Sequence, residues 1–404
     1  MSTVSTYAAI EIGTSKVVVL IGEILDGKTL NLLGVGVQKS KGVRKGKIVD
    51  FRAASHCTHT AILEAEAAAG VKVNFVFLSQ TGAHLVSNFN KGSTLVRSSD
   101  NRVTKEDMKR AISDAKSKQL HVNRVYIHYV QNPFYLDGAR VEDPFDCQGD
   151  RLEVGYLSIH GDERTIKDHI HVINGIGLHV EDMIVASVAS GASVADDSDK
   201  KMGVLVIDIG SGTTDYVLYR DGYIVKTGAV PIGGDHITND LRFGLRVDHE
   251  NAEMIKKTYG KAIIDPSDYD EKIWLRTDPE GGLTIGDRQI RKRGIYQIVN
   301  ARVDELFTII QDELGGFLDP KHIGAGLILT GGSSRLNGIE KVAGSCLGLV
   351  ATKTPISSSA DPINSPENST VVGLLTYALK HPNEGKTRGK KKSLMGKLST
   401  ILSF

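Results

Sequence analysis

Residues 204–215 decide the fold, and they have the sequence Val-Leu-Val-Ile-Asp-Ile-Gly-Ser-Gly-Thr-Thr-Asp. Such a run of apolar, β-branched residues is typical of a buried strand. The acid Asp208 lies at its end, and the turn that follows contains Gly210 and Gly212. Glycines let successive backbone N–H groups converge on an anion, because no Cβ atom keeps the anion off the backbone. The stretch therefore predicts a strand–turn–strand hairpin that binds phosphate.

A second stretch of the same design lies about 200 residues earlier, near the amino terminus. The segment Tyr7-Ala-Ala-Ile-Glu-Ile-Gly-Thr-Ser-Lys16 runs directly into the apolar residues 17–21. One such hairpin would be weak evidence, because ordinary tight turns have the same composition. Two of them predict two similar lobes that face one nucleotide.

Both turns carry groups that suit a nucleotide site. Lys16 can reach a β- or γ-phosphate as a point charge. Asp208 and Asp215 can hold Mg²⁺ directly or through its water molecules. The predicted phosphate-binding residues are Gly13, Thr14, Ser15 and Lys16 in the first turn and Gly210, Ser211, Gly212, Thr213, Thr214 and Asp215 in the second.

Residues 325–339 form a third segment of this kind, in which an apolar strand runs into Gly331-Gly332 and a helix-like segment follows. Two glycines allow the backbone to lie flat against an adenine or an α-phosphate. We expect Gly331, Gly332 and Ser333 to contact the adenosine part of the nucleotide.

These three elements, in this order, resemble the actin-like ATPase superfamily, and within it the chain closely resembles the FtsA family of bacterial cell-division proteins. The resemblance covers nearly the whole chain. It implies an α/β fold with two actin-like lobes, in which helices cover mixed sheets, and an extra small α+β subdomain inserted in the first lobe. The further motifs that carry it are Gly46-Lys-Ile-Val-Asp50, Thr81-Gly-Ala-His84, residues 103–112, Asp143-Pro-Phe145, residues 149–154 and Val230-Pro-Ile-Gly-Gly-Asp235.

The alternation of predicted strands and helices, together with the resemblance, implies a division into subdomains. A helix is predicted from Phe51 to Ala69, and another begins at Thr104. The expected parts are the first lobe core (IA) at 1–83 and 166–203, the inserted subdomain (IC) at 84–165, the second lobe core (IIA) at 204–240 and 325–380, its outer subdomain (IIB) at 241–324, a flexible linker at 381–389 and an amphipathic membrane-targeting helix at 390–404.

The resemblance also extends the nucleotide site into the second lobe. Gly234 lies in the turn before a long helix, and Glu253, Lys256 and Lys257 lie one turn apart on the next one. Their place in the family pattern implies that they bind the ribose hydroxyls and the edge of adenine. From spacing alone, a surface ion pair accounts for them equally well.

One position departs from the family pattern. Relatives normally have Asp at the start of the first phosphate loop, and this chain has Glu11. The extra methylene moves the carboxylate by more than about 1 Å, so either the hydration of Mg²⁺ rearranges or the metal shifts toward Asp208. We take Glu11 and Asp208 as the candidate catalytic and metal-binding residues, with Mg²⁺ held through water. ATP binding with at most weak hydrolysis is expected, and no catalytic base is identified.

The resemblance further implies protein partners. It places the groove for the FtsZ tail within 241–324, and it assigns contacts with neighbouring subunits and with other division proteins to 84–165. Basic side chains at Arg288, Arg291 and Arg293, with Arg302 on the helix that follows, suit an acidic and apolar peptide. A solvated charge run is an equally good explanation for any one of them.

The carboxyl-terminal segment predicts a membrane anchor. From Lys386 onward there are six basic residues and no acidic one. On a helix the apolar residues fall within an arc of about 120°, and so short a helix should order only on contact with an anionic lipid surface. Docking on a protein is the alternative. The predicted membrane contacts are the apolar Leu394, Met395, Leu398, Ile401, Leu402 and Phe404 and the basic Lys390, Lys391, Lys392 and Lys397.

The composition fits a cytoplasmic protein. A chain of 404 residues is longer than a single hydrophobic core usually supports, so more than one domain is expected. Its net charge of +1 indicates no nucleic-acid partner. Cys57, Cys147 and Cys346 lack a paired spacing, which excludes a zinc ribbon. We expect neither a signal peptide nor a membrane span. Several histidines cluster between 121 and 171 without metal-site spacing, and strand alternation predicts that His128 faces outward.

The sequence thus predicts an ATP-binding protein that polymerises on the inner face of the cytoplasmic membrane at the division site and anchors FtsZ there. Two alternatives share its motifs. One is a pilus-assembly relative of the PilM type, for which no basic amphipathic tail is expected. The other is a sugar or acetate kinase, which needs an acid to deprotonate an acceptor hydroxyl. No such acid is evident beyond the nucleotide loops.

Overall fold

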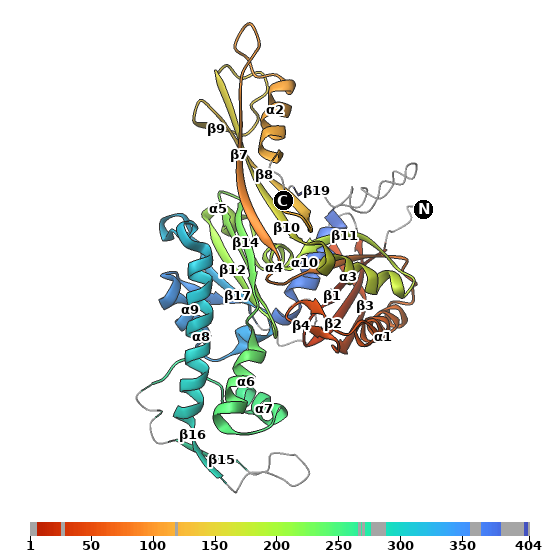
Figure 1. Cartoon of the computed structure of the whole chain (residues 1–404), viewed down its shortest axis with the longest axis vertical. Helices are drawn as coiled ribbons and strands as arrows, with labels where there is room; N and C mark the ends of the chain where they lie inside the picture. Colours follow the sequence, from red (N-terminus) through yellow and green to blue (C-terminus); the bar gives the residue numbers. More distant parts are fainter. Residues whose placement is uncertain are drawn as a thin grey trace.

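The computed structural model describes residues 6–25, 29–117, 120–265, 268, 271–275, 288–355, 365–380 and 400–402. Within these residues the strands form three five-stranded sheets and two small two-stranded ones. Figure 1 shows the three large sheets in separate parts of the molecule, with the inserted subdomain at the top.

Two of the large sheets have the same topology. In each, three consecutive antiparallel strands are followed by two strands that add in parallel beside the first, in the orders β11-β6-β1-β2-β3 and β14-β13-β12-β17-β18. This confirms the predicted pair of similar lobes. The first sheet comprises β1 (Thr6–Ile12), β2 (Lys16–Leu25), β3 (Thr29–Lys39), β6 (Phe75–Gln80) and β11 (His179–Val185), and the second comprises β12 (Val204–Ile209), β13 (Thr214–Arg220), β14 (Tyr223–Val230), β17 (Gly326–Thr330) and β18 (Ala351–Lys353).

Helices cover both lobe sheets. In the first lobe, α1 spans Phe51–Ala69, as predicted, and begins at an Asp50 cap whose side chain accepts from the Ala53 N–H. Further helices of the two lobes are α3 (Glu163–Gly175), α4 (Ala186–Val194), α5 (Asp197–Met202), α8 (Lys292–Leu314), α9 (Ile339–Leu347) and α10 (Ser369–Lys380), with short 3-10 turns at Gly315–Phe317, Pro320–His322, Gly332–Arg335 and Pro366–Asn368.

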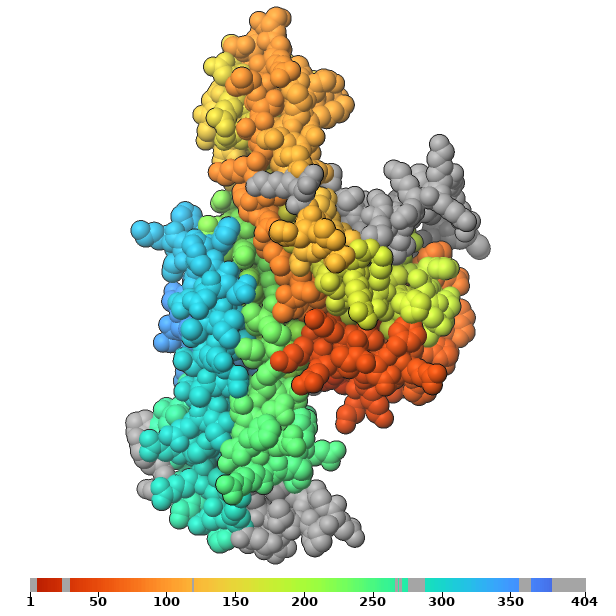
Figure 2. Space-filling model, in the orientation of Figure 1, coloured from red at the N-terminus to blue at the C-terminus, as the bar shows by residue number. Residues whose placement is uncertain are grey.

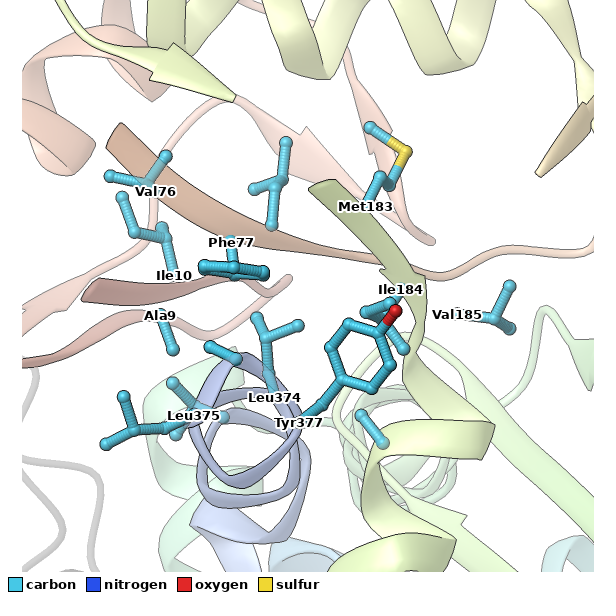
Figure 3. Packing of buried hydrophobic residues seen from close by; sticks show 14 of the residues in the cluster. Ala9, Ile10, Val76, Phe77, Met183, Ile184, Val185, Leu374, Leu375 and Tyr377 are labelled. Carbon is cyan, nitrogen blue, oxygen red and sulfur yellow. The ribbon is translucent and has the colours of Figure 1, made fainter. Parts of the chain in front are cut away.

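Helix α10 is the last described helix, yet it packs in the core of the first lobe. Its Leu374, Leu375 and Tyr377 lie against Ala9 and Ile10 of β1 and the neighbouring strands (Figure 3). A Cβ atom at Gly373 of α10 would lie 1.8 Å from the Ala189 carbonyl oxygen of α4, so the two helix backbones touch there. The carboxyl-terminal part of the chain therefore completes the lobe that the amino terminus begins.

The inserted subdomain has a sheet and a core of its own. Strands β7 (Val86–Leu95), β8 (Arg124–Leu136), β9 (Ala139–Val141) and β10 (Arg151–Asp162) are covered by α2 (Lys105–Lys116). As predicted, α2 begins at Thr104, which forms a capping box with Asp107. This subdomain also touches the second lobe, because the Thr227 N–H of β14 donates to the Ser87 hydroxyl of β7 at 3.1 Å.

The outer part of the second lobe lies at the opposite end of the molecule (Figures 1 and 2). It contains α6 (Gly234–Leu245), α7 (His249–Tyr259), the hairpin of β15 (Lys272–Leu275) and β16 (Arg288–Arg291), and the first turns of α8. In the first lobe, a small hairpin of β4 (Val43–Arg44) and β5 (Lys47–Ile48) precedes α1. No helix among the described residues is long and apolar enough to cross a membrane.

The outward orientation predicted for His128 is wrong. Its side chain is fully buried, and Nε2 accepts a hydrogen bond from the Val185 N–H at 3.4 Å. Burial lowers the pKa of His128 to about 3, so the ring stays neutral. Alternation failed here because both faces of β8 are covered at this point, where the inserted subdomain meets the first lobe.

The predicted carboxyl-terminal helix and linker lie almost entirely outside the described residues. The exception is Thr400–Leu402, which forms β19 in parallel register with His128–Val130 of β8. For these three residues the helical prediction is wrong in this structure. An open sheet edge offers unpaired backbone groups that an apolar segment can pair with, whereas a short helix has little stability in water.

Candidate nucleotide-binding cleft

A cavity of about 730 Å³ lies between the two lobes, within the size range of small-molecule sites. Residues from both phosphate hairpins, from the Gly331-Gly332 turn and from α7 line it. The predicted site residues that line it are Glu11, Gly13, Thr14, Ser15, Lys16, Asp208, Gly210, Ser211, Gly212, Thr213, Asp215, Gly234, Glu253, Lys256, Lys257, Gly331, Gly332 and Ser333.

Thr214 is the one predicted nucleotide-binding residue that does not line this cavity. Its side chain is fully buried, and its hydroxyl donates to the Ile232 carbonyl at 2.8 Å. Successive side chains of a strand point to opposite faces, so Thr214 turns away from the cavity that Thr213 and Asp215 face.

The two hairpins have the same turn geometry and touch each other. The Gly13 N–H donates to the Lys16 carbonyl at 3.0 Å, and the Gly210 N–H donates to the Thr213 carbonyl at 2.9 Å. A Cβ atom at Gly212 would lie 2.5 Å from the Thr14 hydroxyl, so glycine is needed where the two loops meet. A phosphate in the cleft would therefore face backbone and hydroxyl donors from both lobes at once.

Three carboxylates, those of Glu11, Asp208 and Asp215, line the cavity beside these hairpins. Burial, reinforced by Asp208, raises the pKa of Glu11 to about 8, and burial raises the pKa of Asp215 to about 7. Burial also raises the pKa of Asp208. The Glu11 Oε2 atom is buried and has no hydrogen-bond partner. Desolvated acids with an unused oxygen fit a site for a hydrated divalent cation.

The described side chains do not form a site that would coordinate a metal ion directly. Among the residues that the structure describes, no three His, Cys, Asp or Glu side chains come together as a direct metal site. Mg²⁺ usually keeps several water molecules and uses one or two carboxylates besides substrate phosphates. The geometry therefore fits the predicted water-mediated role of Asp208 and Glu11.

One hydrogen bond crosses the cleft beside these acids. Thr81, at the end of β6 in the first lobe, donates its hydroxyl to Asp215 of the second lobe, with both carboxylate oxygens at 2.7 Å. The same hydroxyl lies 3.3 Å from Thr213. Thr81 thus links the two lobes by a hydrogen bond within the cavity lining.

Where α7 lines the cavity, Glu253 and Lys256 form an ion pair at 2.6 Å. The Lys256 ammonium also donates to the Gly234 carbonyl at 3.0 Å and to the Thr238 hydroxyl at 2.8 Å. The pair has the i,i+3 spacing of a surface pair, but both residues line the cavity, and only 14% of Lys256 is exposed. Their role in binding ribose stays a prediction.

Sequence reasoning missed part of the cavity wall. From the sequence, Thr81 was noted only as part of a family motif, and the turn Ser365-Pro-Glu-Asn-Ser-Thr370 was not identified as part of the site. Proline at the first position of a helical turn with hydroxyl residues nearby is a helix-start signal that could have drawn attention to it. Other cavity residues that the sequence did not indicate are Tyr259, Lys261, Lys292, Tyr296, Arg335, Leu336 and Asn337.

The basic residues predicted to bind a peptide lie where β16 passes into α8. Arg288 and Arg291 are exposed on β16, and Arg288 also donates to the Leu245 carbonyl. Arg302, three turns along α8, forms ion pairs with Asp240 at 2.6 Å and with Glu305. Its charge is thus largely compensated within the molecule, while the charge of Arg291 faces solvent.

Comparison with known proteins resolves the family. The model of "Cell division protein FtsA" matches residues 205–373, and that of the "SHS2 domain inserted in FTSA" matches residues 82–160. Cell division protein FtsA of Pseudomonas aeruginosa is 31% identical over 93% of this chain and 90% of its own length. That of Neisseria meningitidis is 33% identical over 92% of this chain and 90% of its own length. This chain belongs to the FtsA family.

Solved structures agree on the fold. The PilM-PilN type IV pilus biogenesis complex superposes with a TM-score of 0.64, at 16% identity, over 92% of this chain and 98% of the other. MreB5 of Spiroplasma citri bound to ADP gives 0.56, at 15% identity, over 94% of this chain and 99% of the other. This FtsA-family chain therefore has an actin-like fold, and the likeness to PilM shows the fold alone.

Proposed function

We propose that this protein binds Mg-ATP in the cleft, polymerises on the inner face of the cytoplasmic membrane at the division site and anchors FtsZ there. The observation that carries the proposal is the cavity that both phosphate hairpins and the Gly331-Gly332 turn line together. Because the nucleotide would contact both lobes, it acts chiefly as a switch for lobe closure and polymerisation. Membership of the FtsA family supports the division role.

The nucleotide site is built for binding more clearly than for hydrolysis. Asp208 and Glu11 would hold a hydrated Mg²⁺, which would neutralise charge on the phosphate oxygens. Binding is spread over many backbone and hydroxyl donors, whereas attack by water requires one geometry. Glu11 at the position of the usual Asp is consistent with weak ATPase activity.

Sedimentation with ATP and anionic vesicles tests the proposal. We expect filaments on the vesicles in electron micrographs and co-sedimentation that depends on Mg-ATP. A soluble monomer that never assembles, but transfers phosphate to a small acceptor, would establish the kinase alternative. Nucleotide binding without attachment to vesicles would favour the alternative of the PilM type.

The attachment of FtsZ is tested where β16 passes into α8, at the exposed Arg291 and the half-buried Arg293. Changing Arg291 and Arg293 to Glu should weaken binding of an FtsZ tail peptide at low salt and reduce its salt dependence, because the peptide is acidic and apolar. The matched control changes Arg52 and Arg164, two exposed arginines of the first lobe, to Glu. An unaltered binding isotherm in the first variant would remove these residues from the interface.

Membrane attachment is tested on the tail. Replacing Leu394 and Leu398 by Asp should release the protein from anionic vesicles, because charge on the predicted apolar face opposes insertion. Replacing Ser399 and Ser403 by Asp adds the same charge on the predicted polar face and should release much less. Deletion of 390–404 should abolish vesicle binding and leave ATP binding intact. Full vesicle binding by the truncated chain would refute the anchor.

A further inference from the structure

Lys16 makes a contact that the sequence did not indicate. Its ammonium group donates a hydrogen bond of 2.6 Å to the side-chain oxygen of Asn368, which lies 352 residues later in the chain. Lys16 lines the cleft, while Asn368 is 7% exposed and is not part of the cavity lining. Asn368 therefore reaches the cleft through Lys16.

The turn that carries Asn368 is firmly attached to the second lobe. The Asn368 N–H donates to the Ser365 carbonyl at 2.9 Å. The Pro366 carbonyl accepts from the Gly331 N–H at 3.0 Å and from the Thr330 hydroxyl at 3.2 Å. Helix α10 then continues into the buried core of the first lobe (Figure 3). The acceptor for Lys16 is thus fixed from both sides, so it can hold a long, flexible side chain in one orientation.

The chemistry of the acceptor leaves the positive charge available. An amide oxygen is neutral, whereas a carboxylate in that place would compensate the ammonium charge. Glu367, the nearest acid on the same turn, forms an ion pair with Arg335 at 2.7 Å. None of the ion pairs between described residues includes Lys16. Burial lowers the pKa of Lys16, and the nearby Glu11, Glu367 and Asp208 carboxylates oppose that shift. A phosphate entering the cleft would meet an ammonium group that is already oriented and that no ion pair ties to a carboxylate.

The same turn also holds the second hairpin. Thr370, two residues after Asn368, donates its hydroxyl to Asp208 at 2.9 Å, and the Ser369 hydroxyl lies 3.4 Å from the same oxygen. Residues 366–370 therefore contact one charged group of each phosphate hairpin. They lie at the point where the two hairpins must stay in register for one triphosphate.

We propose that Asn368 is a positioning residue for Lys16, holding its ammonium group at the phosphate end of the cleft through a neutral oxygen. This inference rests on the proposed nucleotide site. It makes the turn that leads into α10 a third part of that site, beside the two hairpins. Its effect should depend on the number of phosphates, because only the terminal phosphates of ATP are expected to reach Lys16.

The experiment measures the affinity of the full chain for ATP, ADP and AMP by calorimetry, with Mg²⁺ present. Asn368→Ala should weaken ATP about fivefold, the effect of one lost hydrogen bond, and leave AMP unchanged. Asn368→Asp keeps the size of the side chain and should weaken ATP about tenfold or more, because it pairs with the ammonium group and repels the phosphates. Thr376→Ala, on the helix α10 that follows this turn and with only a local bond to the Val372 carbonyl, is the control and should bind as the parent does.

A double-mutant cycle separates positioning from a merely structural role. In a Lys16→Ala background, Asn368→Ala should have no further effect on ATP affinity. An additive loss in that background, or an equal loss for AMP, would overturn the proposal, as would parental ATP affinity in both Asn368 variants. If the parent chain itself fails to bind ATP, the nucleotide site is wrong and the inference falls with it, which is a distinct result. Thermal unfolding without nucleotide verifies that each variant is folded.

Discussion

The two phosphate hairpins share a backbone turn, but their acids have unequal surroundings. Asp208 in the second hairpin accepts hydrogen bonds from Thr370 and Ser369 at the start of α10. Glu11 in the first hairpin is equally buried, yet its Oε2 atom has no partner. The same local sequence design therefore produces one acid that is held in place and one that is not. The difference comes from the start of α10, whose Ser369 and Thr370 hydroxyls donate to Asp208, whereas no hydrogen bond from it to Glu11 is found among the described residues.

The largest effect is expected from removing the acid that is held. Asp208→Ala should weaken Mg-ATP by about 100-fold or more, on the order of 3 kcal/mol, because a charged, metal-linked contact in a closed cleft has no substitute nearby. Calorimetry measures it. Ser211→Ala, which removes one hydroxyl from the same loop, should lose far less. Equal losses in the two variants would show that the Asp208 carboxylate matters no more than one hydroxyl group of the loop. Unchanged affinity in Asp208→Ala would mean that the nucleotide binds elsewhere.

The second effect concerns the acid without a partner. The pKa of Glu11 is raised from 4.5 to about 8, so between these values the folded protein keeps a proton that the unfolded chain releases. The nucleotide-free protein should therefore lose stability as the pH rises from about 4.5 to 8, and below that window Glu11 contributes nothing.

Glu11→Gln removes this titration and should stabilise the empty protein at pH 8 by a few kcal/mol. Denaturant unfolding at pH 5 and pH 8, in the parent and the variant, measures the difference. The gain should be small at pH 5. A gain of the same size at both values would mean that Glu11 is already ionised in the folded protein.

The third effect tests the length of the first acid. Glu11→Asp introduces the shorter side chain that the family resemblance implies at this position and should raise the rate of phosphate release several-fold, about 1 kcal/mol in the barrier. A phosphate-release assay at saturating Mg-ATP measures it. An equal or lower rate would show that the longer acid does not limit turnover.

The smallest effect is expected from removing a hydrogen-bond donor to Asp208, which leaves this acid less well held, as Glu11 is. Thr370→Val keeps the shape of the side chain but removes the hydroxyl that donates to Asp208. Losing one charge-assisted hydrogen bond should weaken Mg-ATP about fivefold, on the order of 1 kcal/mol. Calorimetry on this variant and on Asp208→Ala compares their losses of Mg-ATP affinity. If Thr370→Val binds as tightly as the parent does, the start of α10 does not hold the acid.

Much of the fold could be predicted because its signals are local. The hairpin at Tyr7–Lys16, helix α1 and the cap at Thr104 depend on residues within a few positions of one another, and all three were predicted correctly. His128 was misjudged because its burial depends on a contact with Val185 of β11, which lies 57 positions later in the chain. Thr214 was misjudged because a turn motif does not say which of two neighbouring hydroxyls faces the cavity.

The sequence by itself determined the two glycine-containing hairpins, the Gly331-Gly332 turn and the family, because each is encoded in a short run of adjacent residues. Only the tertiary structure decided how these pieces are supported. The bond from Lys16 to Asn368, the bond from Thr81 to Asp215 and the hold of Thr370 on Asp208 join residues 134 to 352 positions apart. No spacing rule links such residues. The bonds to Lys16 and Asp208 form because α10 packs into the first lobe, and that packing depends on apolar residues that lie far apart in the sequence.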